Sequence, residues 1–124
     1  LKTTPNSQIV LRQLAWSDNH RGQALARLGR VPEATTVLRT ALQSQQQACD
    51  MGGRTKRDLS ALGGIWNNLG FGLEGQQDIA AATDAYRTAV ANLTASIDDT
   101  DSSDLERNAL ERAKTNLKRM QTGV

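Results

Sequence analysis

The chain has 124 residues, a net charge of +2 and only 3% aromatic residues, whereas alanine, leucine and glutamine are abundant. This length suits one domain that buries its own core, and the absence of β-branched runs with period two favours an all-α fold built from small and aliphatic contacts. A single cysteine excludes an internal disulfide, and no apolar run is long enough to predict a membrane-spanning helix.

The first helix is expected over residues 7–28, where Ser7 is suited to be its N-cap. Apolar or small residues recur along this segment and predict the face that packs against the rest of the protein. These residues are Ile9, Val10, Leu14, Gly22, Leu25 and Leu28.

A second helix is expected from Pro32 or Glu33 through Leu42. Pro32 suits its first turn, because a proline there costs no helical hydrogen bond. A glutamine-rich segment extends the helix toward Cys49 before Gly52 and Gly53 stop it.

A third helix is indicated by large apolar residues at three- and four-residue steps within residues 65–74, which places them along one stripe. They are Ile65, Trp66, Leu69 and Leu73. Gly70 lies on the same stripe. Because glycine has no side chain, a second helix can approach closely at this position.

The fourth helix, over residues 78–96, presents small and apolar residues at the same steps. They are Ala82, Ala85, Tyr86, Ala89, Val90 and Leu93. Between the two helices, Gly75 is suited to a helix end and Asp78 to an N-cap. The two segments therefore predict an antiparallel helical hairpin.

The spacing of these residues resembles the tetratricopeptide repeat, whose pattern is W-x2-L-G-x2-Y followed by A-x3-F in about 34 residues. The matching residues are Trp66, Leu69, Gly70, Ala82, Tyr86 and Ala89. Leu73 replaces the tyrosine, and Thr94 lies near the place of a terminal proline. Both departures leave the packing pattern intact.

A second copy of the pattern lies upstream, 48 positions earlier from Ala82 to Ala34. The remaining matches pair Gly22 with Gly70, Leu25 with Leu73, Leu38 with Tyr86, and Ala41 with Ala89, while Gly29 falls at the turn. The copy departs from the pattern where Asp18 aligns with Trp66 and Arg21 with Leu69. Its long period places surplus residues between the units, within residues 43–58.

The last helix is expected over residues 104–120, after a capping box formed by Ser103 and Glu106. Its predicted apolar face comprises Leu105, Ala109, Ala113, Leu117 and Met120. In repeat proteins such a helix covers the apolar surface that the last unit exposes. It is either this cap or the first helix of a degenerate third unit.

The resemblance, which covers residues 16–97, implies an all-α fold: a right-handed superhelix of antiparallel helical hairpins with about five helices. The chain is then a single tetratricopeptide-like domain over residues 1–124. Its parts are a first hairpin at 7–50, a second hairpin at 57–97 and a capping helix at 103–120.

No catalytic, cofactor or metal site is expected. His20 is the only histidine and has no nucleophile in a motif beside it. Asp98, Asp99, Asp101 and Asp104 lack the glycine of a calcium loop, and the glycines near residues 63–72 have the wrong spacing for a phosphate loop. The sequence therefore predicts that the chain is not an enzyme.

The resemblance also implies a concave groove, lined by the first helices of successive units, that binds partner peptides. Transferred by the alignment, the groove residues are Trp16, Asn19, His20, Gln23, Arg27, Asn67, Asn68, Phe71 and Glu74. Some members hold a carboxylate of the partner's C-terminus, but Asn19 stands where those proteins have a lysine. That activity is not carried over.

The preferred function is a protein-interaction module that binds a peptide or partner helix, as a scaffolding or regulatory part of a larger cytoplasmic protein. No small-molecule substrate and no membrane partner are expected.

Residues 1–60 hold nine basic and four acidic side chains, and residues 61–124 hold six basic and nine acidic side chains. Nucleic-acid binding through Arg54, Lys56, Arg57 and the other arginines of the first half is a less favoured alternative. Stacking with a second copy, as a homo-oligomer, also stays open.

Overall fold

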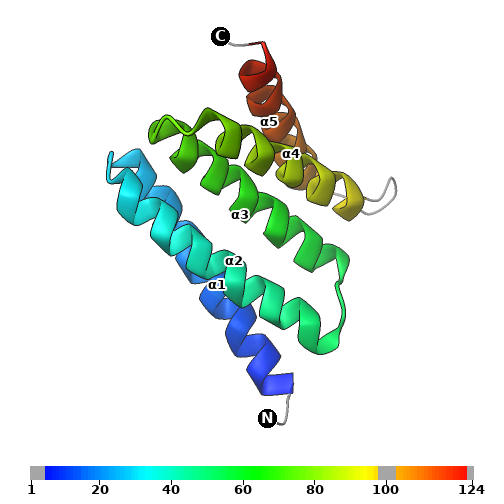
Figure 1. The fold of residues 1–124 in the computed structure, drawn as a ribbon. Coiled ribbons are helices and arrows are strands. Elements are labelled where there is room, and N and C mark those ends of the chain that lie inside the picture. Colours follow the sequence, from blue (N-terminus) through cyan, green and yellow to red (C-terminus); the bar gives the residue numbers. More distant parts are fainter. Residues whose placement is uncertain (1–4, 98–102, 123–124) are drawn as a thin grey trace.

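The computed structural model describes residues 5–97 and 103–122, which form five α-helices and no strand. The helices are α1 (Pro5–Arg27), α2 (Val31–Gly52), α3 (Lys56–Gly75), α4 (Ile79–Ser96) and α5 (Asp104–Gln121). The all-α prediction is confirmed for these residues. Figure 1 shows the α1–α2 pair beside the α3–α4 pair, with α5 against the second pair.

Helix contacts follow the order of the chain. The largest contacts join α1 to α2 and α3 to α4, and smaller ones join α2 to α3 and α4 to α5. In addition, α3 contacts both α1 and α5. Within the described residues, the backbones of α1 and α2 do not come close to those of α4 or α5. The backbone of each helix is therefore close only to helices one or two places away in the chain.

The α1–α2 connection is a tight left-handed turn at Gly29, which has φ 82°. The amide of Gly29 donates to the carbonyl of Ala26 (3.1 Å), and the amide of Arg30 donates to the carbonyl of Leu25 (2.9 Å). These two bonds form a Schellman motif, in which glycine is favoured because its left-handed backbone conformation meets no side-chain clash.

The α3–α4 connection repeats this motif 48 residues later, at Gln77 with φ 64°. The amide of Gln77 donates to Glu74 (2.9 Å), and the amide of Asp78 donates to Leu73 (3.0 Å). Gly75 ends α3, but Gln77 rather than Gly75 takes the left-handed position. The Asp78 N-cap is confirmed, since its carboxylate accepts from the amide of Ala81 at 3.2 Å.

Two glycines let paired helices approach closely at equivalent positions. A Cβ atom on Gly70 would lie 2.7 Å from two ring carbons of Tyr86, and one on Gly22 would lie 2.5 Å from Cγ of Leu38. Because real Cβ contacts do not occur at these distances, each glycine is required by the side chain opposite. A close glycine contact thus occurs in both hairpins, at positions that are 48 residues apart.

We expect Gly70→Leu to lower the free energy of unfolding by about 1–3 kcal/mol, because the added side chain overpacks against the Tyr86 ring. Urea denaturation followed by circular dichroism measures the change. Gly64→Ala is the control, since a Cβ there meets only the amide nitrogen of Asn19 at 3.8 Å. Equal midpoints for both variants and the wild type would contradict the close approach.

The core consists of three connected clusters. One joins α2, α3 and α4 around Leu38, Leu69, Leu73, Ala82, Ala85 and Tyr86. A second joins α4 to α5 through Ala89, Leu93, Leu110 and Ala113, and a third joins α1, α2 and α3 through Ala15, Ala41 and Ile65. The predicted stripe of α3 is buried at Ile65, Leu69 and Leu73, and Trp66 is half-buried between the first two clusters.

The predicted packing face of α1 is wrong for its large residues. Ile9, Val10, Leu14 and Leu28 are exposed, whereas Ala15, Gly22 and Ala26 are buried. The buried residues are spaced by seven and four positions and therefore lie on one face. Small side chains on that face bring α1 close to α2, and the larger apolar residues consequently lie on the other faces.

The predicted apolar face of α5 needs one correction. Leu105 is 74% exposed, and Leu110 is buried in its place beside Ala113. Leu105 and Leu110 are five residues apart, so their side chains lie about 140° apart around the helix axis, and Leu105 is turned away from α4. Leu117 and Met120 pack against the first cluster, as predicted. The Ser103 N-cap is also confirmed, because its hydroxyl accepts from the amide of Glu106 at 3.2 Å.

The surplus residues lie where the sequence places them. They form the last turns of α2, a short connection at residues 53–55, and the first turn of α3. Gln45, Ala48 and Cys49 are buried in this extension. Of the predicted acidic cluster, Asp98, Asp99 and Asp101 lie outside the described residues, and Asp104 begins α5.

A candidate interaction face on helices α1, α3 and α5

The predicted groove residues lie mainly along α1 and α3, on one face to which α5 also contributes; we call it the interaction face. Two hollows open on this face. The first hollow, of about 540 Å³, is lined by α1, α2 and α3. The second hollow, of about 160 Å³, is lined by α1, α3 and α5.

The first hollow has apolar walls and a charged end. Its apolar lining comprises Ile9, Ala15, Trp16, Ala61 and Ile65. The polar lining comprises Arg12, Gln13, Asn19, Gln45, Arg57 and Asp58. The hollow therefore offers an apolar chamber beside several guanidinium and amide groups.

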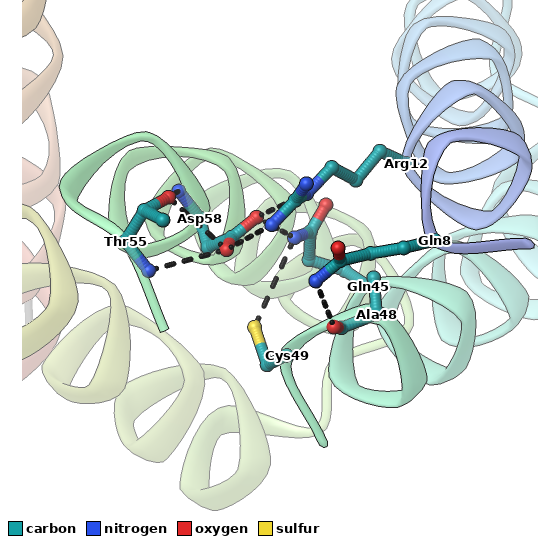
Figure 2. Close-up of polar contacts among 7 residues, drawn as sticks. All are labelled: Gln8, Arg12, Gln45, Ala48, Cys49, Thr55 and Asp58. Carbon is teal, nitrogen blue, oxygen red and sulfur yellow. Dashed lines mark hydrogen bonds and ion pairs between the residues drawn. The ribbon is translucent and has the colours of Figure 1, made fainter. Parts of the chain in front are cut away.

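Asp58 is the centre of a buried polar cluster at the charged end (Figure 2). Its side chain is 2% exposed, and its oxygens accept five hydrogen bonds. Arg12 donates two from Nε (2.9 Å) and Nη2 (2.8 Å), and Gln45 donates one at 2.8 Å. The amide and hydroxyl of Thr55 donate the other two, at 3.2 and 3.1 Å.

The cluster ties three helices together at one end of the molecule. Thr55 is the N-cap of α3, and its hydroxyl accepts from the amide of Asp58 to complete a capping box. Arg12 reaches this helix end from α1, and Gln45 reaches it from α2 (Figure 2). Every buried side-chain donor and acceptor in the described residues is satisfied. This arrangement holds the walls of the first hollow in place.

Asp58 is charged in this setting. Burial raises the pKa of its carboxyl, but the hydrogen bonds from Arg12 and Thr55 outweigh burial and lower it below the ordinary value. The pKa of Arg12 is raised, chiefly by its hydrogen bonds to Asp58. The pair is therefore a carboxylate and a guanidinium, and their charges cancel.

The second hollow is lined by amides, two arginines and an aromatic ring. Its residues are Gln23, Ala26 and Arg27 of α1, Asn67, Asn68 and Phe71 of α3, and Arg112 and Asn116 of α5. The side-chain amide of Asn116 donates to Asn67 at 3.2 Å and fixes α5 to this face. Arg112 and Asn116 were missed at the sequence level. Arg112 and Asn116 are four residues apart, as are Gln23 and Arg27. Treating α5 as the first helix of a third unit would have found them.

A hydrogen bond between two amides separates the hollows. Nδ2 of Asn68 donates to Oδ1 of Asn19 at 2.9 Å, which joins α3 to α1. Oδ1 of Asn68 and Nδ2 of Asn19 have no hydrogen-bond partner among the described residues. Both predicted amides thus keep part of their bonding capacity at the centre of the face.

Two aromatic side chains lie open on the face. Trp16 is 67% exposed beside the first hollow, and Phe71 is 51% exposed beside the second. His20 is exposed and tilts against Trp16, with ring centroids 4.2 Å apart and an interplanar angle of 50°. Trp16 and Phe71 leave a large apolar area uncovered.

Glu74 lines neither hollow and is engaged inside the fold. Its carboxylate accepts from the Tyr86 hydroxyl (2.8 Å) and from Nη2 of Arg119 (2.9 Å), and it forms an ion pair with Nη1 of Arg119. The hydrogen bonds from Arg119 lower the pKa of Glu74 against the opposing effect of burial. This carboxylate therefore links α3 to α4 and α5.

The basic residues of the nucleic-acid alternative lie at the α2–α3 connection. Arg54, Lys56 and Arg57 are all exposed. Arg57 also lines the first hollow and makes no hydrogen bond or ion pair with another described residue. It is thus a free cation at the edge of the interaction face.

Comparisons of the chain with protein-family models, with curated proteins and with solved structures find no match. Within the part of the chain that the structure describes, no group of three or more His, Cys, Asp or Glu side chains is placed to hold a metal ion. None of the helices in that part combines the length and apolar character needed to cross a bilayer. The function is therefore inferred from the interaction face itself.

Proposed function

We propose that the chain is a tetratricopeptide-like interaction module, in which two helical hairpins and a capping helix form a right-handed superhelix. Contacts between helices that follow one another in the chain support this proposal. The two corresponding close pairs, Gly22 with Leu38 and Gly70 with Tyr86, also support it. The module binds a protein segment along the interaction face and serves as a scaffolding or regulatory part of a larger protein.

One observation carries the proposal: the exposed rings of Trp16 and Phe71 each stand beside a hollow on the same face. Large aromatic side chains dominate binding energy at protein interfaces, because they bury much apolar area with little conformational entropy to lose. A partner that covers them removes this area from water, which stabilises the complex by about 25 cal/mol for each Å² of apolar surface buried.

The amides between the rings support an extended segment as the ligand. Asn19 retains a donor and Asn68 an acceptor at the centre of the face. An extended peptide presents backbone groups of both kinds that such amides can bind. The segment then runs along α1 and α3 from the first hollow to the second.

We expect the double variant Trp16→Ala, Phe71→Ala to bind partner peptides at least about a hundredfold more weakly, since two interface hot spots are lost. Peptides are selected from a random phage library on the wild-type protein, and their affinities are measured by isothermal titration calorimetry. The thermal midpoint should stay nearly unchanged, because both side chains are exposed.

The matched control is Val10→Ala, Leu28→Ala, which removes two exposed apolar side chains that line neither hollow, one on α1 and one in the turn after it. This control should bind the selected peptides like the wild type. Selected peptides that bind both double variants equally well would place the binding surface elsewhere. Failure to enrich any peptide would count against peptide binding as the function.

Light scattering across a concentration series tests self-association in the same samples. Dimers that dissociate in the Trp16→Ala, Phe71→Ala variant would identify a second copy as the occupant of the face. Gel shifts with nucleic acid across a salt series test the remaining alternative, because contacts with phosphates weaken steeply with salt.

A further inference from the structure

The first hollow carries an unbalanced positive charge. Arg12 and Arg57 both line it, but among its described lining residues Asp58 is the only carboxylate. Nε and Nη2 of Arg12 are bound to Asp58, whereas Nη1 has no partner among the described residues. Arg57 has no partner there at all. One positive charge therefore remains after the buried pair is formed.

Asp58 cannot also neutralise Arg57. Its two oxygens already accept five hydrogen bonds, which satisfy both sides of a carboxylate. The pKa of Asp58 is lowered by the hydrogen bonds from Arg12 and Thr55, so the carboxylate stays charged and bound to these two residues. A further anion is thus the complement that the edge of the hollow lacks.

Beside these charged groups and three amide side chains, the lining of the first hollow is apolar. Ile9, Ala61 and Ile65 form its walls, and the exposed ring of Trp16 stands at its side. A space of about 540 Å³ accommodates a leucine- or phenylalanine-sized side chain together with its neighbour. An apolar group that enters this space gains the stabilisation that accompanies removal from water.

We propose that the first hollow recognises an apolar side chain that is flanked by a carboxylate in the partner segment, with the carboxylate bound by Arg57 and by the free edge of Arg12. This inference rests on the proposed function and names the chemistry of the bound segment. Arginine is suited to hold the partner's carboxylate, because its planar guanidinium group can donate two parallel hydrogen bonds to the two carboxylate oxygens. Apolar insertion and charge pairing then take place in the same hollow.

The hollow belongs to the extension that lengthens the first unit. Arg12 lies near the start of α1, Gln45 in the added turns of α2, and Arg57 in the first turn of α3. Arg12, Gln45 and Asp58 of the buried cluster (Figure 2) fix this extension, and all three also line the proposed site. The surplus residues between the two hairpins therefore supply a recognition element.

The test uses three peptides with acetylated and amidated ends: Ser-Gly-Leu-Glu-Glu-Gly-Ser and its analogues with Gln-Gln for Glu-Glu or with Ala for Leu. Binding to the full chain is followed by nuclear magnetic resonance, through the Nε–H signals of Arg12, Arg57 and the Trp16 indole. We expect saturable shifts for the first peptide and affinities about tenfold weaker for each analogue, the loss of one charge-assisted contact or one apolar anchor.

Arg57→Gln should weaken the first peptide about tenfold. Arg54→Gln is the matched control, because it removes the same charge from an exposed position on the same connection that does not line the hollow. Ala61→Leu fills the hollow and should abolish the difference between the leucine and alanine peptides. Thermal melts of all three variants check that each remains folded.

The outcomes separate this inference from the proposed function. If phage-selected peptides depend on Trp16 but bind Arg57→Gln normally and contain no acidic residue, the inference is wrong and the interaction module stands. If Arg54→Gln and Arg57→Gln weaken binding equally, the effect is general electrostatics and the site is refuted. If 4-phenylbutyrate shifts the Arg57 signal while none of the peptides does, the hollow binds small carboxylates and the protein-segment proposal falls.

Discussion

Replacing Arg12 with methionine is expected to lower the free energy of unfolding by about 3–5 kcal/mol at neutral pH, the cost of leaving a buried carboxylate without its half-buried ion-pair partner. The substitution strands the Asp58 carboxylate, whose side chain is only 2% exposed, with Gln45 and Thr55 as its remaining donors. Methionine keeps an aliphatic stem along the wall of the hollow, so the change isolates the guanidinium. Urea denaturation followed by circular dichroism measures the loss.

Arg39→Met is the matched control, because Arg39 is exposed on α2 and has no ion-pair or hydrogen-bond partner among the described residues. A change there should stay within about 0.5 kcal/mol. Equal losses in the two variants would mean that the ion pair between α1 and α3 contributes nothing.

The cost of Arg12→Met should depend on pH with a defined sign. Asp58 has a folded pKa below the ordinary value of 3.8, so its stabilisation is present above that value and is lost as the pH falls through the folded pKa. Without Arg12, burial acts against fewer hydrogen bonds, and the carboxyl of the variant takes up a proton at higher pH. The difference between wild type and variant should therefore be largest near neutrality and shrink below about pH 4.

Tyr86→Ala should cost about 3–5 kcal/mol, the range for removing a large buried aromatic ring. Tyr86 is the largest fully buried side chain, and it packs among Leu38, Leu69 and Leu73. The facing residue on α3 is Gly70, which has no side chain to fill the resulting cavity. Thermal and urea unfolding of the variant measure the loss.

Tyr86→Phe separates the ring from its hydroxyl. Phenylalanine keeps the packing and removes only the hydrogen bond to Glu74, whose carboxylate still binds Arg119. The expected cost is about 0.5–1.5 kcal/mol. A phenylalanine variant as unstable as the alanine variant would show that the polar network, and not the ring, holds α3 to α4.

Most of the interaction face follows from periodicity along single helices. Trp16, Asn19 and Gln23 recur at three- and four-residue steps on α1, and Asn68 and Phe71 do so on α3. Such steps place side chains on one stripe whatever the helices pack against. For this reason seven of the nine predicted residues line one of the two hollows.

Two predicted residues line neither hollow: His20 lies against Trp16, four residues earlier, whereas Glu74 depends on partners far away in the chain. Glu74 lies on the same stripe as Phe71, but it is bound by Tyr86 and Arg119, which are 12 and 45 residues away. Arg112 reaches the second hollow only because α5 packs against α4 and α3. The spacing of residues within one helix does not predict how close two helices lie, because that distance depends on the angle at which they pack.

By itself, the sequence determined the helices, their caps at Asp78 and Ser103, and the close approach of Gly70 to the fourth helix, since all three depend on short-range spacing or on one side chain. Only the tertiary structure decided that Arg12, Gln45 and Asp58 meet in one buried cluster and that a hollow forms beside it. These three residues come from three helices. Their polar interactions are strong because the surrounding interior has a low dielectric constant, whereas ion pairs exposed to water are weak. The chemistry proposed for the partner therefore depends on packing, whereas the helices that carry it depend on the local order of residues.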